Sequence, residues 1–469
     1  MRCSLSSTFY FMNTTQEFKP LTKYKPGSTR ELWSICLPMM LTSITTTLMY
    51  FCDRIILARY SIDAMNACVT AWMASAVPSF AVFGIAAISE VFVGQYNGAK
   101  RYGELAAPVW QMIYFSLMMG VLFVPMGLFA GPWVIPDAYE AWGVPYFVWV
   151  MSFSWLFALI GALSGFFIGQ GKAKIVFVVA TFGNAVNIGL DIVFVFGVPG
   201  FIPEMGAKGA AIATVIAQSI QATILFTLFL RKDDRRLRGS SDMRFKPALF
   251  KECMRVGVPV AIAHGMEVLA WTLLIDLVAI QSELHMVVFA ICQSVFIFFA
   301  FVSEGFQKGV TAVAANYIGA KAWEYIPKMF RSGVRLCTMV LLVLLIPCIF
   351  YPDVIVNAFL VEELQSYSYE ELQSLFQIAF VGVWLAMFFE QLAWLSIGVI
   401  LGAGDTRFLM IMMGLVAWFG GFLPVGIGLH IFHAGPLFAP LMLVFYTICN
   451  STCFYLRYRS GRWKQKVIA

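Results

Sequence analysis

Four polar residues within strongly apolar stretches have the side chains needed to bind a cation or to share a proton. They are Asp53, Asn187, Asp191 and Thr214. A charge at the centre of a lipid bilayer costs about 2.5–3.5 kcal/mol on insertion scales, so an acid in such sequence is a functional candidate. Two carboxylates, an amide and a hydroxyl offer oxygen ligands to Na⁺, or the two acids hold one proton between them. Helix–helix hydrogen bonding is the alternative, and it suits Asn and Thr well.

The spacing of these residues predicts that they meet. Asn187 and Asp191 are four positions apart, so they share one face of a helix. With a rise of about 1.5 Å per residue, all four residues lie about 10 Å below the outer ends of their helices. We therefore predict one cation or proton site in this layer.

Two further acids form a second candidate group. Glu267 and Glu390 each lie about eleven residues from the inner end of an apolar stretch, near the middle of the bilayer. Asp405 stands at the inner start of another stretch, where capping a helix is as good an explanation as a role in coupling. Glu90 and Asp276 lie nearer to the ends of theirs, and we expect structural or interfacial roles for them.

One apolar stretch contains both an acid and a base. Glu304 precedes Lys308 by four positions, which is the favourable order for an ion pair within a helix. Alternatively, Lys308 reaches the depth of Glu267 and acts as its counter-ion. The local pair is a structural explanation, whereas the counter-ion arrangement would make Lys308 and Glu304, like Asp405, modulators of the second group.

The elements that position these residues must be membrane helices. The chain has 469 residues, of which 60% are hydrophobic and 12% charged, whereas ordinary soluble domains carry about 25% charged residues. No ten-residue alternation typical of barrel strands is visible, so the spans are helices. Twelve stretches are long enough to cross a bilayer: 33–58, 67–93, 106–130, 145–168, 174–197, 208–230, 256–281, 285–317, 332–356, 375–401, 408–431 and 435–456.

A charged segment at 231–255 separates two apolar halves and holds nine of the 32 Lys and Arg residues. Acids are interleaved in it and no soluble domain flanks it, so we interpret it as a linker and not as a nucleic-acid-binding arm. The predicted organisation is a tail at 1–32, a first lobe at 33–230, the linker at 231–255, a second lobe at 256–457 and a tail at 458–469.

Charge asymmetry predicts the orientation in the membrane. With both tails inside, the inner segments contain 28 of the 32 Lys and Arg residues, while acids gather in the outer loops. Positive residues favour the cytoplasmic side. We therefore expect a multi-pass protein of the cell (inner) membrane with both termini in the cytoplasm.

The two halves repeat each other. Pro38 matches Pro259 and Gly98 matches Gly319, both at an offset of 221 residues, while GQGKAK and GAGDTR are offset by 233. The extra twelve residues fit in the acidic loop VEELQSYSYEELQS. Six spans per half predict a parallel repeat about an axis along the membrane normal.

These motifs resemble the multidrug and toxic compound extrusion (MATE) family, and in particular its NorM-type members. The resemblance covers roughly residues 30–457 and rests on FCDRIILARYS, VGQYNGAKRYGE, GQGKAK, NAVNIGLDIVF, MGAKGAAIAT, VPVAIAHGMEV and EQLAWLSIGVILGAGDTR. It implies a V-shaped fold of twelve helices in two six-helix repeats. The chain departs from the eukaryotic branch at Thr272 and Ser294, where glutamates are expected. Glu304 and Lys308 stand where relatives usually carry small or apolar residues.

The resemblance also implies roles for the candidate acids. Residues of the same type as Asp53, Asn187, Asp191 and Thr214 form an N-lobe cation or proton site in the DinF-type branch. Glutamates matching Glu267 and Glu390 are implicated in cation coupling and substrate recognition in NorM-type and eukaryotic relatives, and an acid matching Asp405 in the NorM branch.

Enzyme chemistry and bound cofactors are not indicated. The four histidines form no HExxH motif, the ten cysteines have no paired spacing, and no phosphate-binding loop is present. The first 32 residues lack a signal-peptide pattern, and Met12 is a second candidate start beside Met1.

We therefore expect a secondary antiporter, coupled to H⁺ or Na⁺, that exports amphipathic, cationic drug-like molecules by rocker-switch alternating access. It is expected to act as a monomer and to bind no nucleic acid. A flippase for a lipid-linked saccharide or peptidoglycan precursor is the alternative function. A membrane enzyme is the third hypothesis, and it would need an acid, a base and a nucleophile together near an interface.

Overall fold

The computed structural model describes residues 20–351, 354 and 369–468. The regular elements in this part of the chain are helices, and eleven helical stretches are long and apolar enough to cross a membrane. The remaining expected span, 332–356, corresponds to α12 and a π-helical turn, and its last residues fall partly outside the described residues. The all-helical, multi-pass fold predicted from hydropathy is confirmed. Met12 and most of the acidic loop before the tenth span lie outside the described residues.

The first lobe is the group of helices that precedes the linker. It comprises α1 (Thr29–Tyr60), α2 (Ile62–Ala87), α3 (Ser89–Gly98), α4 (Ala106–Val134), α5 (Glu140–Phe153), α6 (Trp155–Ile168), α7 (Ala173–Phe196) and α8 (Gly206–Phe229).

The linker contains the short helix α9, and the second lobe follows it. These elements are α9 (Lys232–Leu237), α10 (Pro247–Ala279), α11 (Glu283–Gly319), α12 (Tyr325–Leu345), the π turn Ile346–Phe350, α14 (Tyr369–Gly402), α15 (Thr406–Leu415), the π segment Val416–Phe422, α16 (Leu423–His430) and α17 (Phe438–Ser460).

Local sequence explains where several helices begin and break. Ser28, Ser61 and Ser282 cap α1, α2 and α11, because each side-chain oxygen accepts a hydrogen bond from a backbone N–H of the first turn. The second expected span, 67–93, is not one continuous helix. It breaks at Ile88 into α2 and α3, and this break turns α3 towards the second lobe.

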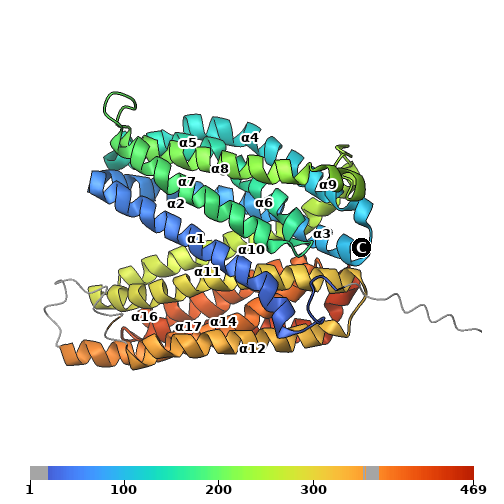
Figure 1. The fold of residues 1–469 in the computed structure, drawn as a ribbon. Helices are drawn as coiled ribbons and strands as arrows, with labels where there is room; N and C mark the ends of the chain where they lie inside the picture. The colour runs from blue at the N-terminus through green and yellow to red at the C-terminus, as the bar shows by residue number, and fades with distance from the viewer. Residues whose placement is uncertain (1–19, 352–353, 355–368, 469) are drawn as a thin grey trace, which may run out of the picture.

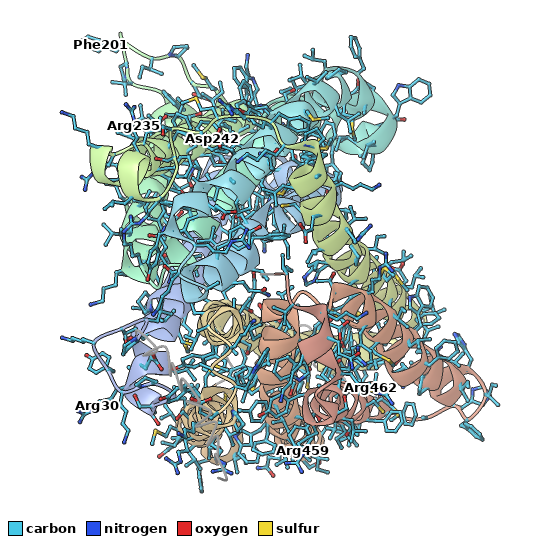
Figure 2. The ribbon with its side chains drawn as sticks, turned by 90° about the vertical axis from the view of Figure 1, so that its right-hand side faces the viewer. Arg30, Phe201, Arg235, Asp242, Arg459 and Arg462 are labelled. Carbon is cyan, nitrogen blue, oxygen red and sulfur yellow. The ribbon has the colours of Figure 1, made fainter. Side chains whose placement is uncertain are left out.

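The two lobes form a V (Figure 1). They meet at the end that carries α3 and α9 and diverge towards the opposite end. We call the first the basic end, because the charged linker and the residues after α17 lie there. Figure 2 looks at this end and labels Arg30, Arg235, Arg459 and Arg462. The loop between α7 and α8, which contains Phe201, lies at the opposite end. We call this the acidic end, because the loop also contains Glu204 and the other outer loops are rich in acids.

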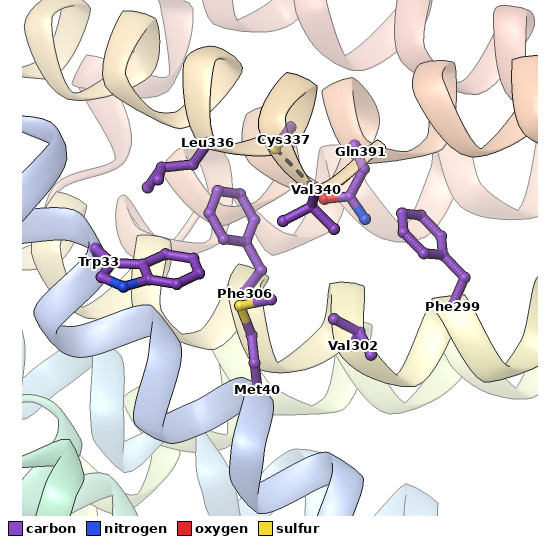
Figure 3. A pocket seen from close by; sticks show the side chains of 9 residues that line it. All are labelled: Trp33, Met40, Phe299, Val302, Phe306, Leu336, Cys337, Val340 and Gln391. Atoms are coloured by element: carbon purple, nitrogen blue, oxygen red, sulfur yellow. Dashed lines mark hydrogen bonds between the residues drawn. The ribbon is translucent and has the colours of Figure 1, made fainter. Parts of the chain in front are cut away.

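Helix α1 connects the lobes by packing against α7 of the first and α11 of the second. Trp33 and Met40 of α1 lie beside Phe306 of α11 and Leu336 of α12, around a cavity of only about 10 Å³ (Figure 3). The Tyr317 hydroxyl of α11 donates to the buried carboxylate of Glu31. The half of α1 nearest the basic end is therefore anchored in the second lobe.

The internal repeat is visible as paired contacts across the basic end. Gln95 Nε2 of α3 donates to the carbonyl of Gly402 at 2.8 Å, and Asn316 Nδ2 of α11 donates to the carbonyl of Gly169, also at 2.8 Å. Gln95 and Asn316 are repeat partners, and so are Gly169 and Gly402. The same contact is thus made twice, as the internal repeat predicted from the motifs would require.

Two glycines allow this close approach of the lobes. A Cβ added at Gly98 would lie 2.0 Å from the carbonyl oxygen of Asn316, and one at Gly319 would lie 1.9 Å from that of Gln95. Neither position has room for a side chain while the end is closed. The backbone N–H of Ile468, after α17, adds a hydrogen bond to Gln95 Oε1 at 2.9 Å.

Candidate functional site

The four polar residues of the first lobe come together from three helices. Asp53 lies on α1, Asn187 and Asp191 on α7, and Thr214 on α8, and α7 packs between the other two. Asn187 lies 3.3 Å from the hydroxyl of Thr214. When its NH₂ faces the acid, its amide donates to Asp53 Oδ1 at 3.2 Å and accepts from the Thr214 N–H at 3.3 Å. The helical spacing of four has thus placed both residues of α7 on the face that meets α1 and α8.

Asp191 is the least satisfied group of this polar cluster. It is fully buried, as is Asn187. Neither carboxylate oxygen of Asp191 accepts a hydrogen bond from a described donor. Its polar neighbour is Asp53, which lies within hydrogen-bonding reach. A buried carboxylate without a donor is costly, so a proton between the two acids, or a cation beside them, would complete the group.

A cavity of about 200 Å³ lies next to this cluster, and Asn187 and Thr214 belong to both. Its wall combines aromatic and thioether groups with hydroxyls and amides. The lining includes Met39, Thr42, Ser43, Thr46, Met49, Tyr50, Phe80, Phe83, Phe157, Asn184, Gln218 and Gln221, together with Glu90, Glu304 and Lys308. A mostly apolar cavity with a few polar groups is the usual form of a site for small organic molecules.

The acids of the second lobe also lie near each other. Glu267 on α10 accepts a hydrogen bond from the Tyr446 hydroxyl at 3.1 Å and lies 3.7 Å from Nδ1 of His264. Glu390 on α14 accepts from Asn450 Nδ2 at 3.3 Å and is buried. Tyr446 and Asn450 both come from α17, four residues apart.

Sequence reasoning did not identify these three partners of the second-lobe acids. His264 precedes Glu267 by three positions, which is a helical neighbour spacing that the sequence does contain. No comparable signal links Tyr446 or Asn450 to the acids, because α17 follows them by about 60 residues or more along the chain.

Asp405 does not cap α15 with its side chain, contrary to one interpretation of the sequence. It is buried and forms an ion pair with Arg457, whose Nη2 and Nε lie 2.6 and 2.9 Å from Oδ2. A guanidinium held at this distance is a stronger partner for the carboxylate than a backbone N–H. The pair ties the start of α15 to the end of α17.

Lys308 pairs with its own helix neighbour. Its Nζ lies 2.7 Å from Glu304 Oε1, and it also stands 5.3 Å from the ring centre of Phe83. Glu267 instead has His264 and Tyr446 as its partners. Lys308 therefore forms the local ion pair with Glu304 and is not the counter-ion of Glu267.

The sequence predicted a structural or interfacial role for Glu90, and the structure buries this residue instead of exposing it at an interface. It lies on α3, is nine-tenths buried and lines the cavity with Glu304 and Lys308. The break at Ile88 lies just before this residue, at the start of the helix that packs against α11.

In the part of the chain that the structure describes, no group of three or more His, Cys, Asp or Glu side chains is arranged to hold a metal ion. The polar cluster of the first lobe has two acids. The amide oxygen of Asn187 and the hydroxyl oxygen of Thr214 are two further possible ligands for a cation. Such a mixed oxygen set suits a hard monovalent cation or a proton better than a soft transition metal.

Known proteins resemble this chain in sequence and in fold. The MatE family model matches residues 38–193. The chain is 23% identical to the probable multidrug resistance protein NorM of Thermotoga maritima, over 94% of this chain and 95% of that protein. It is 29% identical to the multidrug resistance protein NorM of Vibrio cholerae, over 55% and 57% of the two chains.

Among solved structures, the chain superimposes on an outward-facing multidrug resistance MATE family transporter of the MOP superfamily with a TM-score of 0.82. The sequences are 16% identical, and the match covers 96% of this chain and 98% of that one. The resemblance predicted from the motifs is therefore confirmed by independent similarities. In sequence and in fold, the chain is therefore similar to the MATE family of secondary membrane transporters, and within that family to the NorM proteins.

Proposed function

We propose that this transporter exports amphipathic, cationic drug-like molecules in exchange for H⁺ or Na⁺. The observation that carries the proposal is the shared wall between the cavity and the polar cluster. Asn187 and Thr214 line the cavity and contact each other, and the amide of Asn187 also reaches Asp53. A cation bound at the acids and a drug in the cavity would therefore act on the same side chains.

The coupling follows from charge. With neither proton nor metal cation bound, Asp53 and Asp191 make the cavity wall negative and favour a cationic drug. Binding H⁺ or Na⁺ neutralises part of this charge and fixes the side chain of Asn187. The affinity for the drug falls, and the drug is released. Loss of the cation on the other side restores the binding state.

The V shape supplies the alternating access. We propose that the basic end faces the cytoplasm, because Lys and Arg favour that side, and that the V is open to the outside. Breaking the paired contacts of Gln95 and Asn316 would open the basic end, and closing the acidic end would accompany it.

Glu267 and Glu390 are proposed as a second coupling group. Hydrogen bonds from Tyr446 and Asn450 connect both acids to α17. A change in their protonation would therefore alter the packing of α17 against α10 and α14. Measuring Asp191→Asn and Glu390→Gln side by side would show which group controls coupling.

The alternative flippase function has weaker support. A lipid pyrophosphate would require several cationic groups in the cavity. Among the described residues that line it, Lys308 is the only base, and Glu304 already pairs with it.

The decisive experiment uses purified protein in proteoliposomes. Movement of a fluorescent organic cation such as ethidium is followed while a proton gradient and a sodium gradient are imposed separately. We expect one of the two gradients to drive transport, and Asp191→Asn to remove the response. A rate of drug transport that is the same with and without each gradient would contradict the proposal.

A further inference from the structure

The cavity contains a charged group that the coupling mechanism does not use. Glu90 comes from α3 of the first lobe, whereas Glu304 and Lys308 come from α11 of the second, and the two helices pack together. All three line the cavity. Counted along the helices, Glu90 is five residues and Lys308 eight residues from the lobe contacts at Gln95 and Asn316. With Glu304 twelve residues from Asn316, the group therefore extends from about one to about three turns above the closed basic end.

Two of the three charged groups, Glu304 and Lys308, pair with each other, whereas Glu90 has an oxygen without a hydrogen-bond donor. Lys308 contacts Glu304 at 2.7 Å and lies over the ring of Phe83, so its ammonium already has a partner. Glu90 is nine-tenths buried, and its Oε1 accepts no hydrogen bond from a described donor. Lys308 is near enough to interact with Glu90 electrostatically but forms its ion pair with Glu304. Glu90 thus presents an unused hydrogen-bond acceptor beside an ion pair that is already complete.

We propose that Glu90 binds the N–H group of a protonated amine, and that this contact gives the transporter a preference for such amines over quaternary ammonium ions. A buried carboxylate oxygen without a donor gains most from a ligand that brings a charge-assisted hydrogen bond. A quaternary ammonium brings the charge but has no N–H to donate. This inference rests on the proposed function and specifies the substrate class of its cavity.

The rest of the cavity fits an aromatic substituent on the amine. Phe83 stacks on Phe157 with ring centres 4.3 Å apart, and Phe80 meets Phe157 edge-on at 5.4 Å. These rings line the same cavity as Glu90. An arylalkyl amine places its ring against this wall while its ammonium reaches Glu90.

The ion pair of Lys308 keeps Glu90 available. If Glu304 lost its charge, the nearest partner for Lys308 would be Glu90, and the amine would have to compete with a tethered ammonium. Glu304→Gln is therefore expected to weaken amine binding even though Glu90 is unchanged. Removing both charges in Glu304→Gln/Lys308→Met should leave Glu90 free and restore the binding.

The test measures binding of two matched probes to purified, detergent-solubilised full-length protein at one pH and without any ion gradient. The probes are a secondary arylalkyl amine and its N,N,N-trimethyl derivative. A hydrogen bond to a charged group is worth about 1.5–3 kcal/mol, or roughly 10- to 100-fold in Kd. We expect the wild type to prefer the secondary amine by about ten-fold or more.

Glu90→Gln should weaken binding of the amine more than binding of the trimethyl probe and so remove most of this preference, because both probes lose the attraction of the charge but only the amine loses the hydrogen bond. The trimethyl probe also serves as the folding control. Equal binding of the amine by wild type and Glu90→Gln, or no preference in the wild type, would overturn the inference. So would failure of the Glu304→Gln/Lys308→Met variant to recover the affinity that Glu304→Gln loses. If the binding pattern holds but no gradient drives export, only the proposed coupling function is wrong.

Discussion

At the scale of single residues, Asp191 is the most informative side chain of the candidate coupling site. It is fully buried, accepts no hydrogen bond from the described donors and faces another acid, Asp53. Two facing carboxylates in a dry site repel each other unless a proton or a cation lies between them. Purely structural hydrogen bonding, the alternative considered from sequence, explains Asn187 and Thr214 but leaves Asp191 without a role.

Asp53→Asn and Asp191→Asn should each reduce gradient-driven drug efflux by at least about ten-fold with expression nearly intact, because the amide keeps the shape and removes the charge. The measurement is efflux from proteoliposomes at matched protein content. Asp63→Asn is the control, since Asp63 is exposed in the first turn of α2. Wild-type efflux rates in both variants would show that the cluster is structural.

The ion pair of Asp405 with Arg457 should matter for stability more than for transport. Arg457→Gln leaves a buried carboxylate without its partner, and removing one member of a buried pair costs about 3–5 kcal/mol. We expect a clear fall in the melting temperature of the detergent-solubilised protein. The double variant Asp405→Leu/Arg457→Met should recover most of the loss, because it leaves no unpaired charge. Unchanged melting in Arg457→Gln would argue against the structural role.

At the scale of helices, the repeat determines how the lobes meet. α3 and α11 are repeat partners, and each reaches across to the carbonyl of a tight turn in the opposite lobe. Gly98 and Gly319 allow the two helices to approach until their backbones touch. Closure of the basic end therefore depends on glycine, which has no side chain, at these two positions as much as on the hydrogen bonds.

Gly98→Ala should shift the transporter away from the state closed at the basic end, because the new Cβ would lie 2.0 Å from the Asn316 carbonyl oxygen. With spin labels at positions 102 and 324, one on each lobe, pulsed electron paramagnetic resonance should measure a longer mean distance between the two labels. Gly103→Ala is a matched control, since nothing lies within 4 Å of a Cβ there. Identical distance distributions in wild type and Gly98→Ala would contradict this account.

At the scale of the whole molecule, the V has chemically different ends. Charged residues of the linker and of the segment after α17 gather at the basic end, and the exposed loop with Phe201 lies at the other. The proposed orientation places the basic end in the cytoplasm. The direction of drug export depends on this assignment.

Cysteine labelling of whole cells tests the orientation. In a variant without the native cysteines, we expect Phe201→Cys to react with a membrane-impermeant maleimide from outside. Arg235→Cys should react only after the cells are permeabilised. Both side chains are exposed, so the labelling depends on which side of the membrane each residue faces and not on whether it is buried in the protein. The reverse labelling pattern would invert the proposed orientation.

The sequence by itself determined the properties that run along each helix. Hydropathy located the spans, since a helix must bury about 20 residues to cross the bilayer. The rise per residue placed Asp53, Asp191 and Thr214 in one layer. The equal offsets of the proline and glycine pairs revealed the repeat. All of these properties depend on how far a residue lies along its own helix, and that distance follows directly from residue numbers.

Only the tertiary structure decided which side chains face one another across helices. It brought Glu90 into the cavity beside Lys308, set Tyr446 and Asn450 against the acids of the second lobe, and paired Asp405 with Arg457. Such contacts depend on the rotation of each helix about its axis and on its neighbours. Those are fixed by packing between segments far apart in the chain, and depth in the membrane carries no information about them.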